Sequence, residues 1–173
     1  CREAGQRLHS MLYDKIFRSL LDFKVRYLAI GGIAVNLHGF PRATGDLDIL
    51  LSFEPANVDA FLAAARKLGL KPRAPVPMEG LSDPEKRREW AIEKGMHAFT
   101  LISPNNPMEQ LDVVISDHID FEEAYARRET VAAGEVEIPL VCMDDLIALK
   151  EKSGRDRDLI DLKVLKELKE IKR

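Results

Sequence analysis

The chain has 173 residues, with 26 Lys and Arg against 29 Asp and Glu, so its formal net charge is −3 with the histidines neutral. This length is typical of a single domain, and no apolar run approaches the roughly 18–20 residues that a membrane span requires. The acidic balance excludes a basic field over the whole surface that would attract nucleic acid. A function on phosphates would therefore depend on a local patch or on metal ions.

The two cysteines, Cys1 and Cys142, are too few and too far apart for a disulfide framework or for a zinc site with paired spacing. This usage predicts a reducing compartment. The first residues lack the charged, apolar and small-residue segments of a signal peptide. We therefore expect a cytoplasmic location and no membrane partner.

The first half of the chain predicts alternating helices and strands. Apolar residues at helical spacing after Ser10 predict the first helix, and a β-rich run that stops at Gly31-Gly32 predicts the first strand. Gly39 ends the next short helix, and Gly69 follows the next long one. The predicted elements are a helix over 11–23, a strand over 25–30, a helix over 33–37, a strand over 46–53 and a helix over 55–68.

The second half begins with three prolines between residues 72 and 77, which predict an exposed loop over 72–82. The later predicted elements are a helix over 84–94, strands over 96–102 and 110–115 separated by a turn over 103–107, a helix over 121–127, a hairpin turning at Gly134, and helices over 143–152 and 157–171. Several strands follow one another without a helix between them. This order favours an α+β fold, a mixed β-sheet flanked by helices with C-terminal helices, over a strict doubly wound fold.

Two carboxylates converge near the start of the second predicted strand. Side chains alternate along a strand, so Asp46 and Asp48 share one face, with Cα atoms roughly 6.6 Å apart. Unpaired, the two groups would raise each other's pKa, whereas a hard divalent cation between them keeps both ionised. The pattern is typical of a Mg²⁺ site completed by substrate phosphates. The alternative is that Asp46 caps a turn after Gly45 and Asp48 is solvated on an edge strand.

Gly31-Gly32 follows a predicted strand and precedes a predicted helix. Backbone N–H groups at such a turn, with no side chains in the way, can donate hydrogen bonds to a phosphate. The alternative is a tight turn that only allows close packing. A phosphate-binding turn followed about fifteen residues later by paired carboxylates indicates a nucleotide site.

A third carboxylate is predicted on a later strand. Leu111, Val113 and Ile115 share one face, which leaves Asp112 on the other. An aspartate in so apolar a strand is costly unless it is paired or ligates a metal, so Asp112 is the expected third ligand. The alternative is a pair with a lysine or arginine. Asp117 and Asp120 lie beyond the strand and are expected to be caps or solvated turn residues.

These residues resemble the nucleotidyltransferase superfamily of the DNA polymerase β type, and within it the AbiEii-toxin-like and related small bacterial nucleotidyltransferases. The resemblance covers roughly residues 25–165, whereas residues 70–95 match no known pattern. It rests on two groups of residues, Gly31-Gly32-Ile33-Ala34-Val35, His38-Gly39, Arg42, Thr44, Asp46-Leu47-Asp48 and Asp112, and then Lys150, Gly154-Arg155-Asp156-Arg157-Asp158 and Asp161.

The resemblance implies a single nucleotidyltransferase-like domain over 1–173, with a core over about 25–116 and a C-terminal helical segment over about 143–173. It implies that Asp46, Asp48 and Asp112 hold two Mg²⁺ ions, with Mn²⁺ as a possible substitute. The remaining implied site residues bind the nucleotide: Gly31 and Gly32 at the phosphates, Lys150 as the cation on the triphosphate, Arg42 and Arg155 as weaker candidates, and Thr44. Asp158 and Asp161 are expected to be structural, the first as a cap or a partner of Arg155 and the second orienting Lys150.

The implied function is transfer of a nucleoside monophosphate from an NTP to an acceptor hydroxyl on a tRNA 3′ end, a small molecule or a protein. A toxin–antitoxin setting would add a cognate toxin or antitoxin partner. One alternative is a non-catalytic nucleotide-binding or interaction module that retains the fold. A metal-dependent phosphohydrolase is a third reading, but the four histidines do not cluster with the aspartates in sequence. We expect acceptor specificity in the loop over 72–82 and the helix after it.

Four further residues have two interpretations each. His38 either stacks on a base or is a satisfied histidine before Gly39, and the second is favoured. Thr44 either bonds a phosphate or fixes the turn between Arg42 and Asp46. Trp90 either stacks on RNA or anchors a solvated helix, and the second is favoured because acids neutralise the neighbouring bases. Lys150 has the alternative of a plain solvated lysine. The last helix is expected to pack an apolar stripe of Leu159, Leu162, Leu165 and Leu168 on the core.

Overall fold

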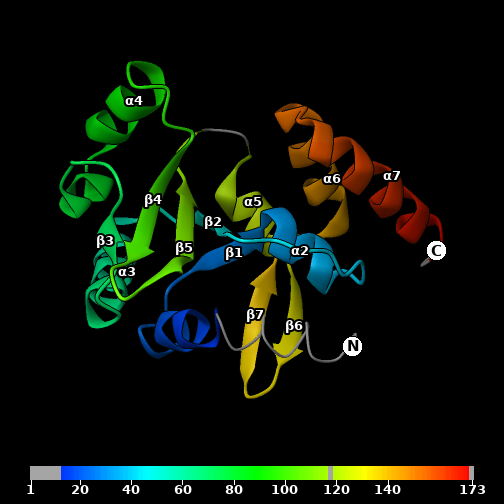
Figure 1. The fold of residues 1–173 in the computed structure, drawn as a ribbon, viewed down its shortest axis with the longest axis horizontal. Helices are drawn as coiled ribbons and strands as arrows, with labels where there is room; N and C mark the ends of the chain where they lie inside the picture. The colour runs from blue at the N-terminus through cyan, green and yellow to red at the C-terminus, as the bar shows by residue number, and fades with distance from the viewer. Residues whose placement is uncertain (1–12, 117–118, 172–173) are drawn as a thin grey trace.

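The structure, a computed structural model, describes residues 13–116 and 119–171. One seven-stranded mixed sheet forms its centre, in the order β3-β4-β5-β2-β1-β7-β6 (Figure 1). The strands are β1 (Tyr27–Ile30), β2 (Leu47–Leu51), β3 (Lys71–Pro72), β4 (Ala98–Ser103), β5 (Asn106–Val114), β6 (Glu129–Ala133) and β7 (Val136–Leu140).

Helices flank this sheet, and the C-terminal helices α6 and α7 pack on each other, with α6 also in contact with α2 (Figure 1). The predicted α+β class with a mixed sheet and C-terminal helices is therefore confirmed. The helices are one over residues 13–22, then α2 (Gly31–Leu37), α3 (Pro55–Lys67), the 3-10 helix η1 (Met78–Ser82), α4 (Pro84–Ile92), α5 (Phe121–Ala126), α6 (Met143–Ser153) and α7 (Asp156–Ile171).

Strand β2 lies in the middle of the sheet, between β5 and β1. It runs antiparallel to β1, with Ile30 opposite Asp48, and parallel to β5, with Asp48 opposite Asp112. The apolar residues of β2 that alternate with Asp48 are buried, as are those of β5 that alternate with Asp112. This alternation fixes the register, because a slip by one residue would bury the carboxylates in the core.

Helix α4 covers the apolar face of the β4–β5 hairpin. The Trp90 ring on α4 stacks on Phe99 of β4 with ring centroids 5.2 Å apart, and Phe99 is paired in register with Val113. Asp112, the neighbour of Val113 in β5, therefore lies on the opposite sheet face. Trp90 is only 2% exposed, so the anchoring interpretation of this residue is confirmed and stacking on RNA is excluded.

Two turns show how well local chemistry specifies the hairpins. Gly134 has φ +65° at the β6–β7 turn, the left-handed conformation that glycine adopts most easily, as predicted. The turn predicted over 103–107 is shorter, because β4 continues to Ser103 and β5 already begins at Asn106. The pairing of β4 with β5 shifts in register after Ile102, which pairs with Gln110, whereas Ser103 pairs with Asn106. Pro107, in the skipped part of β5, has no N–H to donate to a neighbouring strand.

Two predictions about exposed segments were wrong. The loop expected over 72–82 contains the 3-10 helix η1, in which Met78 and Leu81 are buried. The Leu stripe expected on α7 fails at Leu159, which is 60% exposed. The buried face of α7 consists of Asp158, Asp161 and Leu165 instead, because the two carboxylates have cationic partners in the interior.

No helix among the described residues is long and apolar enough to cross a membrane. Cys142, at the N-terminal end of α6, has a free thiol, and burial raises its pKa. Cys1 lies outside the described residues, as do Ser10 and Asp117.

Candidate active site

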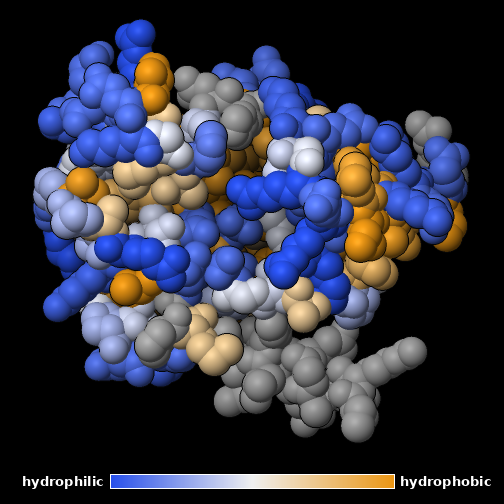
Figure 2. All heavy atoms as spheres, turned by 45° about the horizontal axis from the view of Figure 1, so that its top comes forward, coloured by the Kyte–Doolittle hydropathy of each residue, from blue (hydrophilic) through white to orange (hydrophobic). Residues whose placement is uncertain are grey.

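All the residues predicted for the nucleotide site line one cavity of about 750 Å³. The cavity lies between the sheet and the C-terminal helices. Figure 2 shows this face of the molecule hollowed near its centre, with long hydrophilic side chains around the opening. The predicted residues come from five separate parts of the chain and are Gly31, Gly32, Arg42, Thr44, Asp46, Asp48, Asp112, Lys150 and Arg155.

Asp48 and Asp112 are direct neighbours across the parallel strands β2 and β5. Burial, and then the charges of Asp112 and Asp46, raise the pKa of Asp48 to about 7, while Lys150 and Arg155 act in the opposite direction. The two carboxylates are therefore held close together without a cation that neutralises them fully. Such a pair attracts a divalent cation, which would keep both groups ionised.

Asp112 carries a buried oxygen without a partner. Its Oδ2 atom accepts a hydrogen bond from Gln110 Nε2 at 3.1 Å, whereas Oδ1 is buried and accepts none. No ion pair joins Asp112 to a lysine or arginine of the described residues, contrary to the alternative interpretation. An orphaned buried acceptor of this kind is costly unless a ligand satisfies it.

Asp46 occupies a different position from the one predicted. Strand β2 begins at Leu47, so Asp46 lies just before the strand and is exposed, whereas Asp48 lies within it. It nevertheless lines the cavity and contributes to the raised pKa of Asp48. Asp46 therefore lies at the rim of the carboxylate pair.

Among residues 13–116 and 119–171, no three His, Cys, Asp or Glu side chains form a group that could hold a metal ion. The described geometry offers two neighbouring carboxylates with one unpartnered oxygen, and a third carboxylate at the rim. This arrangement fits Mg²⁺, which proteins commonly hold with one or two carboxylates while substrate phosphates and water complete the octahedron.

Gly31 allows the backbone to pass directly against Asp48. A Cβ atom at Gly31 would lie 2.0 Å from Asp48 Oδ2, and its φ of +67° is unfavourable for any other residue. The two glycines form the first turn of α2, which begins at Gly31 rather than at Ile33 as predicted. Gly32 packs in the same way, because its Cβ would lie 2.4 Å from Thr44 Oγ1 and 3.0 Å from Arg42 Nη2.

The loop before β2 is held from several sides. Asn36 on α2 binds the backbone of Arg42 twice, accepting from its N–H at 2.9 Å and donating to its carbonyl at 3.0 Å. Tyr13 donates its hydroxyl proton to the carbonyl of Gly45. Thr44 Oγ1 reaches the Asp46 carbonyl at 3.5 Å, which agrees with a role in fixing this turn. These contacts fix the backbone that carries Asp46.

Lys150 is buried in an ion-pair network. Its Nζ atom lies 2.5 Å from Asp158 Oδ1 and 2.8 Å from Asp161 Oδ2, so it is not the solvated lysine of the alternative interpretation. Asp161 also pairs with Arg42, at 2.9 Å from its Nε atom. The expected orientation of Lys150 by Asp161 is therefore observed. Asp158 forms its ion pair with Lys150, and its carboxylate also accepts a hydrogen bond from the Arg155 backbone. Burial raises the pKa of Asp158, but the hydrogen bonds and the positive charge of Lys150 together outweigh burial, so the pKa is lowered.

The wall opposite the carboxylates is basic. Lys152, Arg155 and Arg157, at the junction of α6 and α7, are exposed and line the cavity. Gly154 ends α6 with φ +60° and turns the chain so that these side chains follow one another around the rim. Asp158 of α7 also lines the cavity, but it is paired with Lys150. The remaining charges place carboxylates on the sheet side and cations on the helices, a division suited to a metal-bound polyphosphate.

His38 takes no part in this cavity. It is 3% exposed, and its Nε2 atom lies 2.9 Å from the Val141 carbonyl. The interpretation as a satisfied interior histidine is confirmed. Because His38 is buried and does not line the cavity, it does not stack on a base bound there.

Sequence reasoning missed several residues that shape the site. Gln110 shares a strand face with Asp112, so the two-residue period could have indicated it. Lys152 and Arg157 lie within the basic pattern around Arg155 and were identifiable from charge. Asn36 and Tyr13 gave no local signal, because their partners are backbone atoms 6 and 32 positions away along the chain.

Comparisons with known proteins leave the family open. The sequence matches no model of a protein family, and a search of curated proteins finds no match either.

Proposed function

We propose that the protein is a Mg²⁺-dependent nucleotidyltransferase, which transfers a nucleoside monophosphate from an NTP to an acceptor hydroxyl. The observation that carries the proposal is the division of charge in the cavity of about 750 Å³. Carboxylates of β2 and β5 form one wall, and cations of the α6–α7 junction form the other. A nucleoside triphosphate with its metal needs both walls, whereas a site for a free phosphate would need only the cations.

The carboxylate pair would hold the metal. Asp48 and Asp112 would be the principal ligands, with Asp46 at the rim as the third. Magnesium supplies Lewis-acid stabilisation of charge on the phosphates and lowers the pKa of an oxygen that it binds. The unpartnered Oδ1 of Asp112 and the raised pKa of Asp48 are both explained if a cation belongs between them.

The basic wall would bind the triphosphate. Lys152, Arg155 and Arg157 are exposed toward the cavity, whereas Lys150 is neutralised by its two aspartates. Arg155 is therefore a better candidate than Lys150 for direct contact with a phosphate. Lys150 would act through position, by fixing the start of α7 and, through Asp161, the guanidinium of Arg42.

In the transfer, the acceptor hydroxyl oxygen forms a bond to the α-phosphorus of the NTP. The bond from that phosphorus to the bridging oxygen of the β-phosphate breaks, pyrophosphate leaves, and the hydroxyl proton is released to water. The side chains contribute by holding the two reactants in line and by balancing the charge that moves onto the leaving pyrophosphate.

A non-catalytic nucleotide-binding module is the second candidate. The observation that favours it is the absence of a three-ligand group among the described residues, since a complete two-metal site would have one. Such a module would bind NTP without transferring it.

Calorimetric titration of Mg²⁺ and ATP tests the proposal, followed by transfer from α-labelled NTPs to total RNA and cell lysate. We expect ATP binding that requires Mg²⁺, and label transfer that Asp48→Asn abolishes. The matched control is Asp59→Asn, which removes an exposed carboxylate on α3 outside the cavity. The proposal fails if the wild type binds no NTP or if Asp48→Asn transfers label at the wild-type rate. NTP binding without any transfer would favour the non-catalytic module.

A further inference from the structure

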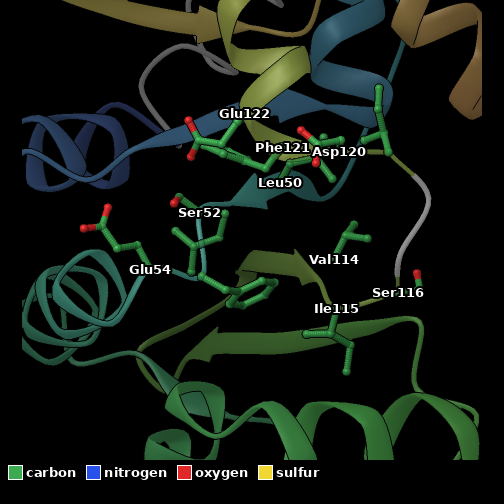
Figure 3. Close-up of a pocket in the computed structure, with 12 residues that line it drawn as sticks. Leu50, Ser52, Glu54, Val114, Ile115, Ser116, Asp120, Phe121 and Glu122 are labelled. Atoms are coloured by element: carbon green, nitrogen blue, oxygen red, sulfur yellow. The ribbon is translucent and has the colours of Figure 1, made fainter.

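A second cavity, of about 650 Å³, opens beyond the carboxylates, at the C-terminal ends of the strands that carry them. Figure 3 shows Leu50, Ser52 and Glu54 on one side of it, with Val114 and Ser116 across from them and the start of α5 above. The cavity therefore lies between the C-terminal ends of β2 and β5 and the first turn of α5. None of residues 72–82, where we expected acceptor specificity, lines either of the two cavities.

The two cavities are neighbours on one face of the sheet. Val114 and Ser116 line both of them. Leu50 follows Asp48 by two positions, and Val114 follows Asp112 by two, so these pairs point to the same face. Two residues of strand span roughly 6.6 Å, which a molecule the size of a monosaccharide bridges easily. A compound in the second cavity can therefore present a hydroxyl group at the carboxylate pair.

The second cavity differs from the first in charge. None of its twelve described lining residues is basic, whereas three of them are acidic: Glu54, Asp120 and Glu122. Outside the lining, Arg26 lies 2.6 Å from Glu122 and 3.8 Å from Glu54, and Arg87 lies over the Phe53 ring at 4.1 Å. Three carboxylates against these two guanidinium groups leave the surroundings acidic.

This lining disfavours a nucleic-acid acceptor and favours an amine. A polynucleotide brings one negative charge for each nucleotide and needs cations along its path. An ammonium group is attracted by carboxylates and by aromatic faces, and Phe53 and Phe121 supply such faces. Each ring already carries a guanidinium group over one face, Arg26 at 5.6 Å from the Phe121 centroid and Arg87 at 4.1 Å from that of Phe53, so the carboxylates are the main groups that would bind an ammonium.

We infer that this second cavity binds the acceptor, and that the acceptor is a small hydroxyl compound carrying an amine. The inference rests on the proposed transfer. The hydroxyl oxygen of the amine compound forms the bond to the α-phosphorus at the carboxylate pair, pyrophosphate leaves toward the basic wall, and the hydroxyl proton goes to water. The ammonium group keeps its protons and acts only in binding.

A charge series on one sugar ring tests the inference. Glucosamine, glucose and glucuronate carry hydroxyl groups on the same ring with charges of about +1, 0 and −1 at neutral pH. Binding of each is followed by backbone amide shifts in NMR spectra of the full chain with Mg²⁺ and ATP. We expect glucosamine to bind at least fivefold more tightly than glucose, glucuronate not to bind, and the shifts to gather around β2, β5 and α5.

The double variant Glu54→Gln, Asp120→Asn removes two charges from the lining. Asparagine retains the capping of α5, where Asp120 accepts from the Glu123 N–H at 2.8 Å, so the fold is preserved. We expect this variant to bind glucosamine at least fivefold more weakly and glucose unchanged. Glu137→Gln, on an exposed position of β7 outside both cavities, is the matched control.

The outcomes separate this inference from the proposed function. If ATP binds with Mg²⁺ but glucosamine has no advantage over glucose and glucuronate, the acceptor inference is wrong and the nucleotide site stands. The same holds if label from ATP enters RNA at a rate that the double variant leaves unchanged. If Mg²⁺ and ATP do not bind at all, the proposed function fails, and the acceptor inference fails with it.

Discussion

The replacement of Asp48 by asparagine is expected to stabilise the metal-free protein at alkaline pH. In the folded chain the pKa of Asp48 is raised from 3.8 to about 7, chiefly by burial and then by the charges of Asp112 and Asp46. Between these two values the folded state binds a proton that the unfolded state has lost. The free energy of unfolding therefore falls as the pH rises through this window, and the loss is complete above about pH 7.

The size of the effect follows from the width of the window. One proton contributes about 1.4 kcal/mol per pH unit, so the two units from pH 5 to pH 7 amount to roughly 3 kcal/mol. Asparagine does not titrate and remains neutral throughout. We therefore expect the difference in unfolding free energy between Asp48→Asn and the wild type to shift by roughly 3 kcal/mol in favour of the variant when the pH is raised from 5 to 8.

Urea unfolding in EDTA at pH 5 and pH 8 measures this difference. Trp90 is the only tryptophan and is buried against Phe99, so its fluorescence reports on the core. Asp59→Asn, which neutralises an exposed carboxylate of α3, should show no pH-dependent gain. If Asp48→Asn and the wild type change equally between the two pH values, the argument from burial and carboxylate repulsion is refuted.

Three further substitutions test other parts of the structure by urea unfolding. Gly31→Ala should lower the free energy of unfolding by about 2 kcal/mol more than Gly95→Ala does. Both glycines have positive φ, but only at Gly31 would a Cβ atom meet a carboxylate oxygen. Equal losses for the two variants would contradict this reasoning. Lys150→Met should cost about 3–5 kcal/mol by leaving two carboxylates buried without their cation, and adding Asp158→Asn should restore part of it. Trp90→Ala should lower the free energy of unfolding by about 3–5 kcal/mol, measured by circular dichroism because the only tryptophan is lost. ATP affinity should not change, and a loss of affinity in the folded variant would contradict a purely structural role for Trp90.

Much of the fold was predictable because local chemistry and tertiary packing agree. The helix predicted over 84–94 is present as α4. Asp83 caps it by accepting from the N–H groups of Glu85 and Lys86, and Pro84 occupies the first helical position. The hairpin at Gly134 follows from a residue that tolerates positive φ. Such signals involve neighbours only a few positions apart, so they are readable without the fold.

The errors in the fold arise where distant partners override local pattern. Leu159 fits an apolar stripe, yet it is the Asp158 and Asp161 side of α7 that faces the interior. The reason is that these two carboxylates form ion pairs there, Asp158 with Lys150 and Asp161 with both Lys150 and Arg42. An ion pair between residues on different elements leaves no periodic signal. Likewise, the prolines before η1 suggested exposure, whereas Leu81 is buried.

The residues that line the candidate site were predictable from the sequence, but the position of Asp46 and the role of Lys150 within the site were not. Alternation along β5 identified Asp112 correctly as the exception among apolar residues. The boundary of β2 at Leu47 could not be predicted to within one residue, so the sequence did not show that Asp46 is exposed just before the strand while Asp48 lies within it. Lys150 was predicted to contact the triphosphate. Its orientation by Asp161 was expected, but its second ion pair, with Asp158, and its burial were not indicated by the sequence.

The charge of the whole chain is a poor guide to this site, because the opposing charges are sorted by element. The sheet carries Asp48 and Asp112, and the burial of Asp48 together with the repulsion between the two carboxylates destabilises the metal-free folded protein above about pH 7. The α6–α7 junction carries Arg155 and its basic neighbours, which only partly offset that repulsion across the cavity. A metal–nucleotide complex supplies a cation to the first wall and an anion to the second. Binding of that complex should therefore relieve the strain on both walls at once, which neither Mg²⁺ nor a free phosphate does alone.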